Sequence, residues 1–105
     1  MQSWKVLAPG SVSQDRLVMT EVAEPLPLAG ELVIEVAACA MCRTDLQIVE
    51  GDLPAHQLPV TPGHQVVGTV VAVGSSVDQT RVGQRVGLAW IASACERCRF
   101  CLEGR

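Results

Sequence analysis

Short apolar runs, several of them rich in β-branched residues, alternate with glycine and proline along most of this sequence. They occupy residues 3–8, 16–22, 31–37, 66–74 and 85–91. Each run has the length of one strand, and turn-forming residues separate them. Many short strands with regular turn signals indicate an all-β barrel or sandwich, so we predict a mainly β fold.

Only two places have a helical pattern, namely residues 43–50 and about one turn after Cys98. The interval 51–63 is a long loop punctuated by three prolines, and it joins the region of Cys42 to His64. A loop of this length can fold back on itself, so we expect it to bring Cys42 and His64 together.

The composition is that of a single soluble domain. The chain has 105 residues, of which 49% are hydrophobic and only 18% charged, so a core is feasible and disorder is not expected. The net charge of −3 argues against nucleic acid or an anionic membrane as the main partner. No apolar run approaches the ~20 residues that span a bilayer, and the start lacks the pattern of a secretory signal. We therefore expect a cytoplasmic protein.

Five cysteines, an odd number, indicate metal or redox chemistry rather than a closed set of disulfides. Three of them form Cys95-x2-Cys98-x2-Cys101 in a tail, residues 93–105, that has lost the valine and isoleucine pattern of residues 1–92. Three thiolates in one loop suit tetrahedral zinc or an iron–sulfur cluster. The bacterial ferredoxin spacing would need a cysteine where Arg105 stands, which disfavours the cluster.

A second group of candidate ligands surrounds Cys42 and His64. A thiolate and an imidazole belong to the ligand set that Zn²⁺ prefers. Thr44 adds a hydroxyl two residues from the thiolate, and Asp45 offers a carboxylate that could orient an imidazole. By itself, however, a histidine after a glycine is more often an ordinary loop histidine.

Four segments taken together identify a family: 42–46 (Cys-Arg-Thr-Asp-Leu), 60–68 (Val-Thr-Pro-Gly-His-Gln-Val-Val-Gly), 82–86 (Val-Gly-Gln-Arg-Val) and the three tail cysteines. In this order they closely resemble the zinc-dependent alcohol dehydrogenases of the medium-chain family. The resemblance implies a GroES-like, partly open β-barrel in residues 1–92 and an incomplete structural-zinc lobe in residues 93–105. It also implies hydride transfer between an alcohol or aldehyde and NAD(P).

The resemblance assigns roles to seven residues, and the chain departs from the family pattern at two more. Cys42 and His64 correspond to two catalytic zinc ligands, Thr44 to the hydroxyl that takes the alcohol proton, and Asp45 to the carboxylate that holds the histidine. The structural-zinc ligands correspond to Cys95, Cys98 and Cys101. Gln65 stands where relatives usually carry Glu, which leaves the site one negative charge short. Gln47 likewise replaces a histidine that passes protons in many relatives, so proton release would need water or another group.

The sequence contains no Gly-x-Gly-x-x-Gly, so we expect the nucleotide-binding domain to be absent from these residues. We therefore predict that the 105-residue piece is inactive alone and self-associates through the exposed face that would meet the cofactor domain. Two alternatives remain open, a non-enzymatic zinc-binding or interaction module and a thiol redox sensor using the tail cysteines. Cys39 and Cys42 form a Cys-x2-Cys pair, which could be a redox pair, but we expect Cys39 to be a small residue buried behind the site. We expect His56 to be a surface histidine.

Overall fold

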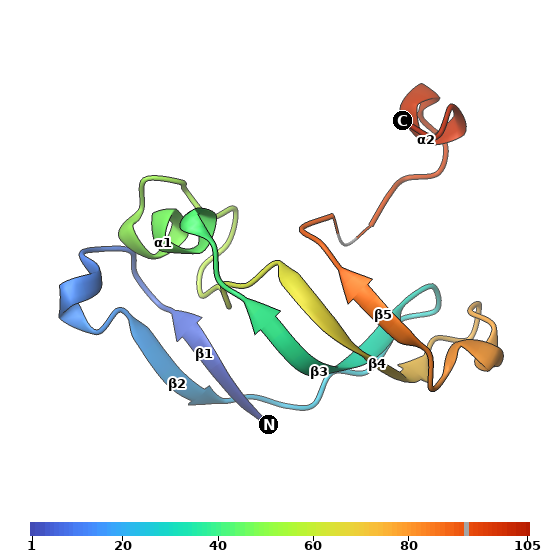
Figure 1. The fold of residues 1–105 in the computed structure, drawn as a ribbon, viewed down its shortest axis with the longest axis horizontal. Helices are drawn as coiled ribbons and strands as arrows, with labels where there is room; N and C mark the ends of the chain where they lie inside the picture. The colour runs from blue at the N-terminus through green and yellow to red at the C-terminus, as the bar shows by residue number, and fades with distance from the viewer. Residues whose placement is uncertain (92) are drawn as a thin grey trace.

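The computed structural model describes residues 1–91 and 93–105 (Figure 1). Its strands are β1 (Gln2–Val6), β2 (Leu17–Glu21), β3 (Leu32–Ala40), β4 (Gln65–Val73) and β5 (Arg85–Leu88). Its helices are α1 (Arg43–Glu50) and α2 (Arg99–Leu102), with 3-10 turns η1 (Val12–Gln14) and η2 (Gln79–Arg81). The prediction of a mainly β fold with one or two short helices is therefore confirmed.

The strands form two antiparallel sheets. β1 pairs with β2, and the second sheet has the order β3-β4-β5. A single bridge between Val6 and Val60 connects β1 to the long loop that precedes β4. The register of β3 and β4 shifts twice, and near the second shift a Cβ on Gly68 would collide with the carbonyl oxygen of Glu35. Glycine is thus required at this close approach of the two strands.

Every predicted strand is present, with ends within two residues of the predicted ones except at the ends of β3 and β5. β3 continues to Ala40, three residues beyond the predicted end, because its pairing with β4 persists past the second register shift. β5 ends at Leu88, three residues before the predicted end, since its pairing with β4 stops there. The two 3-10 turns were not anticipated, whereas α1 has the predicted bounds.

The hydrophobic core is small. Val6, Val49 and Val70 are the buried hydrophobic residues of the described chain, and Asp45 is its buried charged residue. The accessible surface is 7891 Å², whereas a compact monomer of this mass exposes about 5,700 Å². About 2,200 Å² of surface is therefore exposed that a protein of this size normally buries. The two sheets make an open, partial barrel rather than a closed one.

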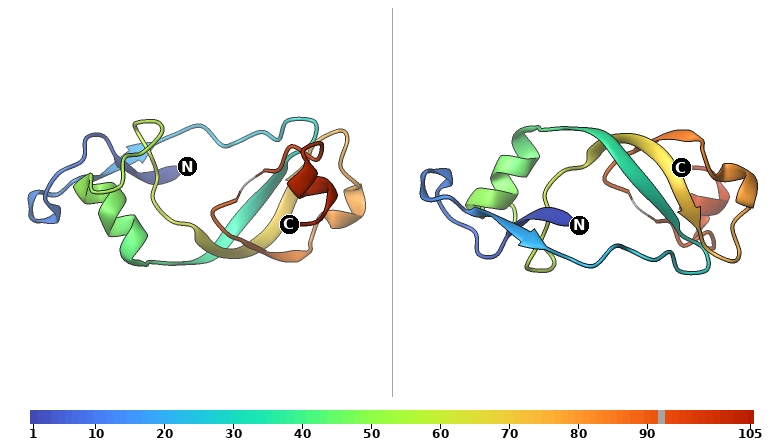
Figure 2. Two further views of the ribbon diagram at one scale, coloured as in Figure 1. Left: turned by 90° about the horizontal axis from the view of Figure 1, so that it is seen from above. Right: turned by 90° about the horizontal axis from the view of Figure 1, so that it is seen from below.

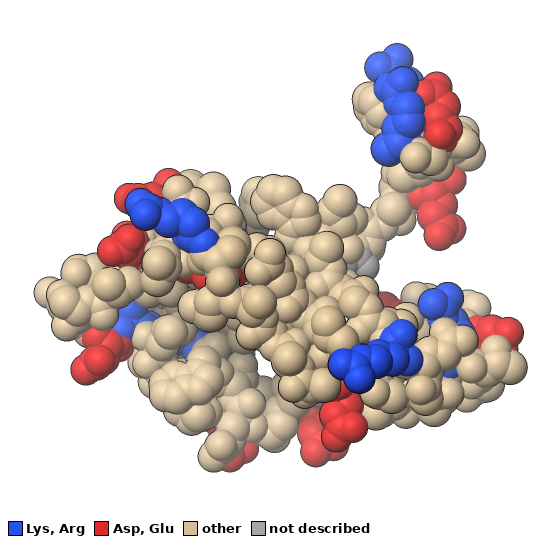
Figure 3. Space-filling model, in the orientation of Figure 1, with Lys and Arg blue, Asp and Glu red and all other residues tan. Residues whose placement is uncertain are grey.

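The tail lobe, residues 93–105, stands apart from the sheets. Both views in Figure 2 place α1 and α2 toward opposite ends of the long axis. On the face drawn in Figure 3, acidic and basic side chains are scattered at the periphery around a broad uncharged area. Within residues 1–91 and 93–105, none of the helices has the length and apolar character needed to cross a membrane.

Candidate metal centres

The start of α1 fixes two candidate site residues. Cys42 is the N-cap, and its Sγ accepts a hydrogen bond from the backbone N–H of Thr44 at 3.3 Å. In return, Asp45 Oδ2 accepts from the backbone N–H of Cys42 at 2.8 Å, which completes a capping box. Helix capping therefore sets the position of the Cys42 sulfur and brings the Asp45 carboxylate beside it.

The same carboxylate reaches the end of the long loop. Asp45 Oδ1 accepts from the backbone N–H of Gly63 at 2.9 Å and lies 3.2 Å from His64 Nδ1. Asp45 is fully buried, so these bonds replace the water that its oxygens lose. A hydrogen bond from Nδ1–H to Asp45 leaves the lone pair of Nε2 free to bind a metal.

The opposite nitrogen of His64 faces the cysteine. His64 Nε2 lies 3.1 Å from Cys42 Sγ, and both side chains are partly buried. In tetrahedral zinc coordination, ordinary Zn–S and Zn–N bond lengths place these two atoms roughly 3.5 Å apart. The pair needs to open by only about 0.4 Å to hold a zinc ion between them. The donor set and its spacing therefore fit zinc. We call this group of Cys42, Asp45 and His64 the first centre.

A cleft of about 670 Å³ adjoins the first centre. Thr44, His64 and Trp90 line it together with apolar residues of the long loop, and the His64 and Trp90 rings lie 6.2 Å apart between centroids. His56 also lines this cleft, although it is exposed as expected. No local pattern predicted this placement, because it depends on the path of the long loop of residues 51–63.

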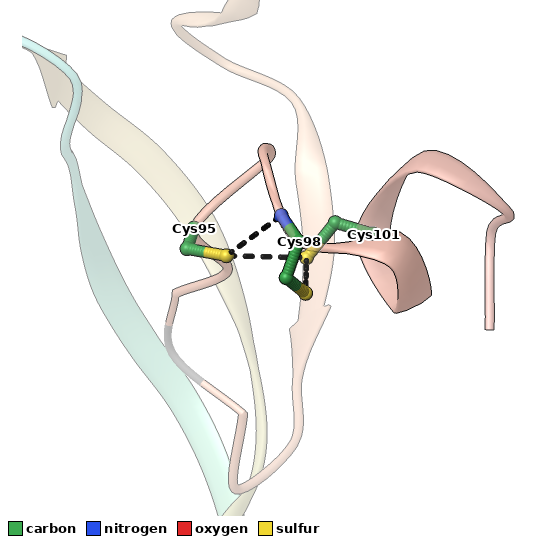
Figure 4. A group of neighbouring side chains, drawn as sticks. All are labelled: Cys95, Cys98 and Cys101. Carbon is green, nitrogen blue, oxygen red and sulfur yellow. Dashed lines mark hydrogen bonds between the residues drawn. The ribbon is translucent and has the colours of Figure 1, made fainter.

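The three tail cysteines form the second candidate centre, which we call the thiol cluster (Figure 4). Cys101 Sγ lies 3.5 Å from Cys98 Sγ and 3.8 Å from Cys95 Sγ. Two thiolates on one tetrahedral zinc ion lie roughly 3.8 Å apart, so this spacing also fits zinc. Cys95 and Cys98 are exposed and Cys101 is half-buried.

Cys95 has an altered acidity. The backbone N–H groups of Arg97 and Cys98, followed by the thiols of Cys98 and Cys101, lower the pKa of Cys95 from 9.0 to about 7. These donors stabilise the thiolate form. The thiolate is also the form that binds metals and reacts with electrophiles.

Two remaining predictions concern Gln65 and Cys39. Gln65 is the exposed first residue of β4, paired with Ala40. The expectation that Cys39 is buried was wrong, because β3 carries it to the exposed edge of the open sheet. Its sulfur nevertheless lies behind the first centre: a Cβ on Gly63 would approach Cys39 Sγ to 2.8 Å.

Comparison with known proteins identifies the family. Residues 28–105 match the family described as the alcohol dehydrogenase GroES-like domain. The chain is 42% identical over 109 positions to the probable alcohol dehydrogenase AdhA of Mycobacterium tuberculosis, covering 99% of this chain and 32% of that protein.

Solved structures agree with this match. The cobalt- and zinc-bound thermostable alcohol dehydrogenase of Pyrobaculum aerophilum is similar with a TM-score of 0.85 and 29% identity, over 99% of this chain and 30% of that one. A zinc-binding dehydrogenase of Sinorhizobium meliloti, solved with NADP, gives a TM-score of 0.74 and 29% identity, over 99% and 28%. This chain thus spans about a third of the length of these relatives or less. It belongs to the GroES-like domain family of zinc-type, medium-chain alcohol dehydrogenases.

Proposed function

We propose that residues 1–105 form the catalytic-domain portion of a zinc-dependent oxidoreductase that interconverts alcohols and aldehydes with NAD(P). The observation that supports this most is the 3.1 Å approach of Cys42 Sγ to His64 Nε2, with the imidazole held from behind by a buried carboxylate. Such a carboxylate–histidine pair is the usual support of a histidine metal ligand. The adjoining cleft suits a small, partly apolar alcohol or aldehyde. The enzyme in this proposal is cytoplasmic.

Cys42 and His64 would hold a zinc ion, which when bound polarises the substrate oxygen. Asp45 fixes the imidazole tautomer by accepting from Nδ1–H. Thr44 lines the cleft, where its hydroxyl can receive the alcohol proton. Gln65 follows His64 directly and, being neutral, adds no negative charge next to the ligand. Proton transfer to solvent needs water or another group, because Gln47 does not titrate.

In this proposal, Cys95, Cys98 and Cys101 hold a structural zinc ion in the lobe of residues 93–105, beside the β domain of residues 1–92. The first centre offers two direct ligands and the thiol cluster three. We expect the missing ligands and the nicotinamide-binding domain to lie outside residues 1–105. The isolated chain should therefore bind zinc without catalysing the reaction.

The large exposed surface favours self-association of this chain. An excess of about 2,200 Å² per molecule is comparable to what each partner buries in large, obligate interfaces. Leu26, Leu28, Trp90 and Ile91 are among the hydrophobic side chains that are more than two-thirds exposed. We expect the chain on its own to self-associate through this surface, which light scattering over a concentration series would detect.

Cobalt binding tests the first centre. Co²⁺ bound to a thiolate absorbs in the visible region, so titration of the chain with Cys95, Cys98 and Cys101 replaced by serine should produce a thiolate–cobalt band from the first centre. Cys42→Ser and His64→Ala should each weaken it. His56→Ala is the matched control, because His56 lines the same cleft without contacting Cys42 in the described structure. A band that survives His64→Ala would contradict the proposal, as would turnover of simple alcohols by the isolated chain with NAD⁺ or NADP⁺.

A thiol redox sensor is the second candidate function, and the exposed thiol cluster with its lowered Cys95 pKa favours it. Counting free thiols before and after peroxide, with and without zinc, separates the two candidates. A metal site predicts that zinc protects the thiols, whereas a sensor predicts loss of two thiols under mild oxidant. An unchanged thiol count would exclude the sensor.

A further inference from the structure

We propose that Cys39 is a positioning residue of the first centre, whose sulfur supports Gly63 and thereby fixes where His64 enters the site. The inference rests on the proposed zinc site and adds a residue outside the proposed ligand set. Three features of the structure support it: the contact of Cys39 with Gly63, the pairing of β3 with β4, and the access to Cys39 from a second groove.

The contact between Cys39 and Gly63 is close. A Cβ built on Gly63 would lie 2.8 Å from Cys39 Sγ, well below an ordinary van der Waals distance. The sulfur therefore occupies the space directly beside the Gly63 α carbon. Gly63 also has a φ of 120°, which is accessible to glycine and strained for other residues. The residue before the histidine ligand is thus restricted both by its backbone angle and by the cysteine beside it.

Gly63 is held by a second contact as well. Its N–H donates to Asp45 Oδ1 at 2.9 Å, the same oxygen that lies 3.2 Å from His64 Nδ1. The carboxylate and the Cys39 sulfur therefore both limit where Gly63 can lie. Since His64 is the next residue, a shift of Gly63 changes both the Asp45 hydrogen bond and the approach of Nε2 to Cys42.

The sheet makes Cys39 a firm support. Cys39 is paired with Val66 across β3 and β4, so its own position is fixed by the backbone just two residues after His64. β3 then runs to Ala40 and leads directly into Cys42 at the start of α1. Cys39 therefore lies three residues before the first proposed ligand, Cys42, and contacts the segment that carries the second, His64.

Cys39 is reached from a different side than the substrate cleft. It lines a groove of about 840 Å³ with Trp4, Val36 and Met41, whereas His64 and Trp90 line the cleft. Thr61 and Pro62 border both spaces in the described structure. A change at Cys39 thus reaches the first centre through the loop that separates groove from cleft, without filling the place of the substrate.

The test is a Co²⁺ titration of the full chain with Cys95, Cys98 and Cys101 replaced by serine in every variant, so that the visible band reports the first centre. Removing a partner that orients a ligand typically weakens metal binding 10–100-fold, and a contact one residue away should act less strongly. We expect Cys39→Ala to raise the half-saturating Co²⁺ concentration about 3- to 10-fold and to change the shape of the band. Cys39→Ser, which keeps an atom at the position of the sulfur, should restore most of the affinity.

Val36→Ala is the matched control. Val36 lies on the same strand and lines the same groove, and it is 56% exposed, but it pairs with Gly68 away from His64. This variant should leave the band unchanged. As a metal-free readout, the ring signals of His64 in NMR spectra should shift in Cys39→Ala and not in Val36→Ala. If Cys39→Ala also lowers the thermal midpoint of unfolding, this NMR comparison decides whether the position of His64 has changed.

The outcomes separate the two proposals. If the parent binds Co²⁺ with a thiolate band and Cys39→Ala matches it in affinity, band shape and His64 ring signals, the inference about Cys39 is wrong while the metal site stands. An equal effect of Val36→Ala would also overturn it, since the effect would then belong to the groove in general. If the parent gives no thiolate–cobalt band, the proposed zinc site is wrong and the inference fails with it.

Discussion

The two candidate metal centres of this chain are built in opposite ways. The ligands of the first centre lie 22 positions apart, and a buried carboxylate joins their segments through bonds to Cys42 N, Gly63 N and the His64 ring. The thiol cluster gathers three cysteines within seven consecutive residues, and two of its three members are exposed. The fold thus organises the first centre before a metal binds, whereas sequence proximity alone assembles the second. We expect metal binding to order the second centre far more than the first.

The strongest test of this contrast is Asp45→Ala. The change leaves two partly buried backbone N–H groups without their acceptor, and hydrogen bonds to a charged group contribute about 1.5–3 kcal/mol each. We expect a loss of about 3 kcal/mol in the free energy of unfolding, measured by urea denaturation. Asp78→Ala is the control, because Asp78 caps η2 through Thr80 N at the exposed surface and should matter much less. Equal losses in both variants would show that Asp45 has no special structural role.

Gly63→Ala should have the next largest effect. A side chain at this position combines a φ of 120° with a 2.8 Å approach to Cys39 Sγ, and such strain costs about 1–3 kcal/mol. We expect a lower thermal midpoint and weaker Co²⁺ binding at the first centre. Gly83→Ala provides the control, since Gly83 has a φ of 88° but open space around its α carbon. A Gly63 variant no worse than the Gly83 variant in Co²⁺ binding would contradict the role of the contact.

A change in the thiol cluster should spare the rest of the fold. We expect Cys101→Ser to abolish tight Zn²⁺ binding by the tail while altering the free energy of unfolding by less than about 0.5 kcal/mol. The reason is that α2, which carries Cys101, lies away from the two sheets in Figure 1. Zinc content after dialysis and urea denaturation are the two measurements. A large loss of stability would mean that the cluster supports the β domain.

The smallest expected effect is one of pH. Because the pKa of Cys95 is lowered to about 7, its thiolate should predominate above pH 7 and react with iodoacetamide there. The lowered pKa of Cys95 also adds to the free energy of unfolding. This contribution is fully present above pH 9.0, the pKa of an ordinary thiol, and is lost as the pH falls through about 7. Alkylation rates of Cys95 against pH, followed by mass spectrometry, test this. A midpoint near that of an ordinary thiol would show that the neighbouring donors are not in place.

Much of the fold could be predicted from local patterns. The helix over residues 43–50 was predicted with its observed bounds, because its cap, Cys42, and the terminating Gly51 directly flank that short segment. Strand ends were predicted less well, since the end of β3 at Ala40 depends on its partner strand. The exposure of Cys39 was predicted wrongly, because a small apolar residue is usually buried and only the open barrel leaves it accessible. The place of His56 beside the cleft depends in the same way on the path of the long loop.

The sequence alone determined the chemistry that each segment can offer. The type of ligand, the capping residues of α1 and the close spacing of the three tail cysteines all follow from neighbours along the chain, whose separation covalent geometry limits. The three-dimensional fold brings Cys42 and His64 together, buries Asp45 beside them and places Cys39 against Gly63. Those contacts join residues far apart in the chain. They depend on the pairing of β3 with β4 and on the return of the long loop, which no local pattern specifies.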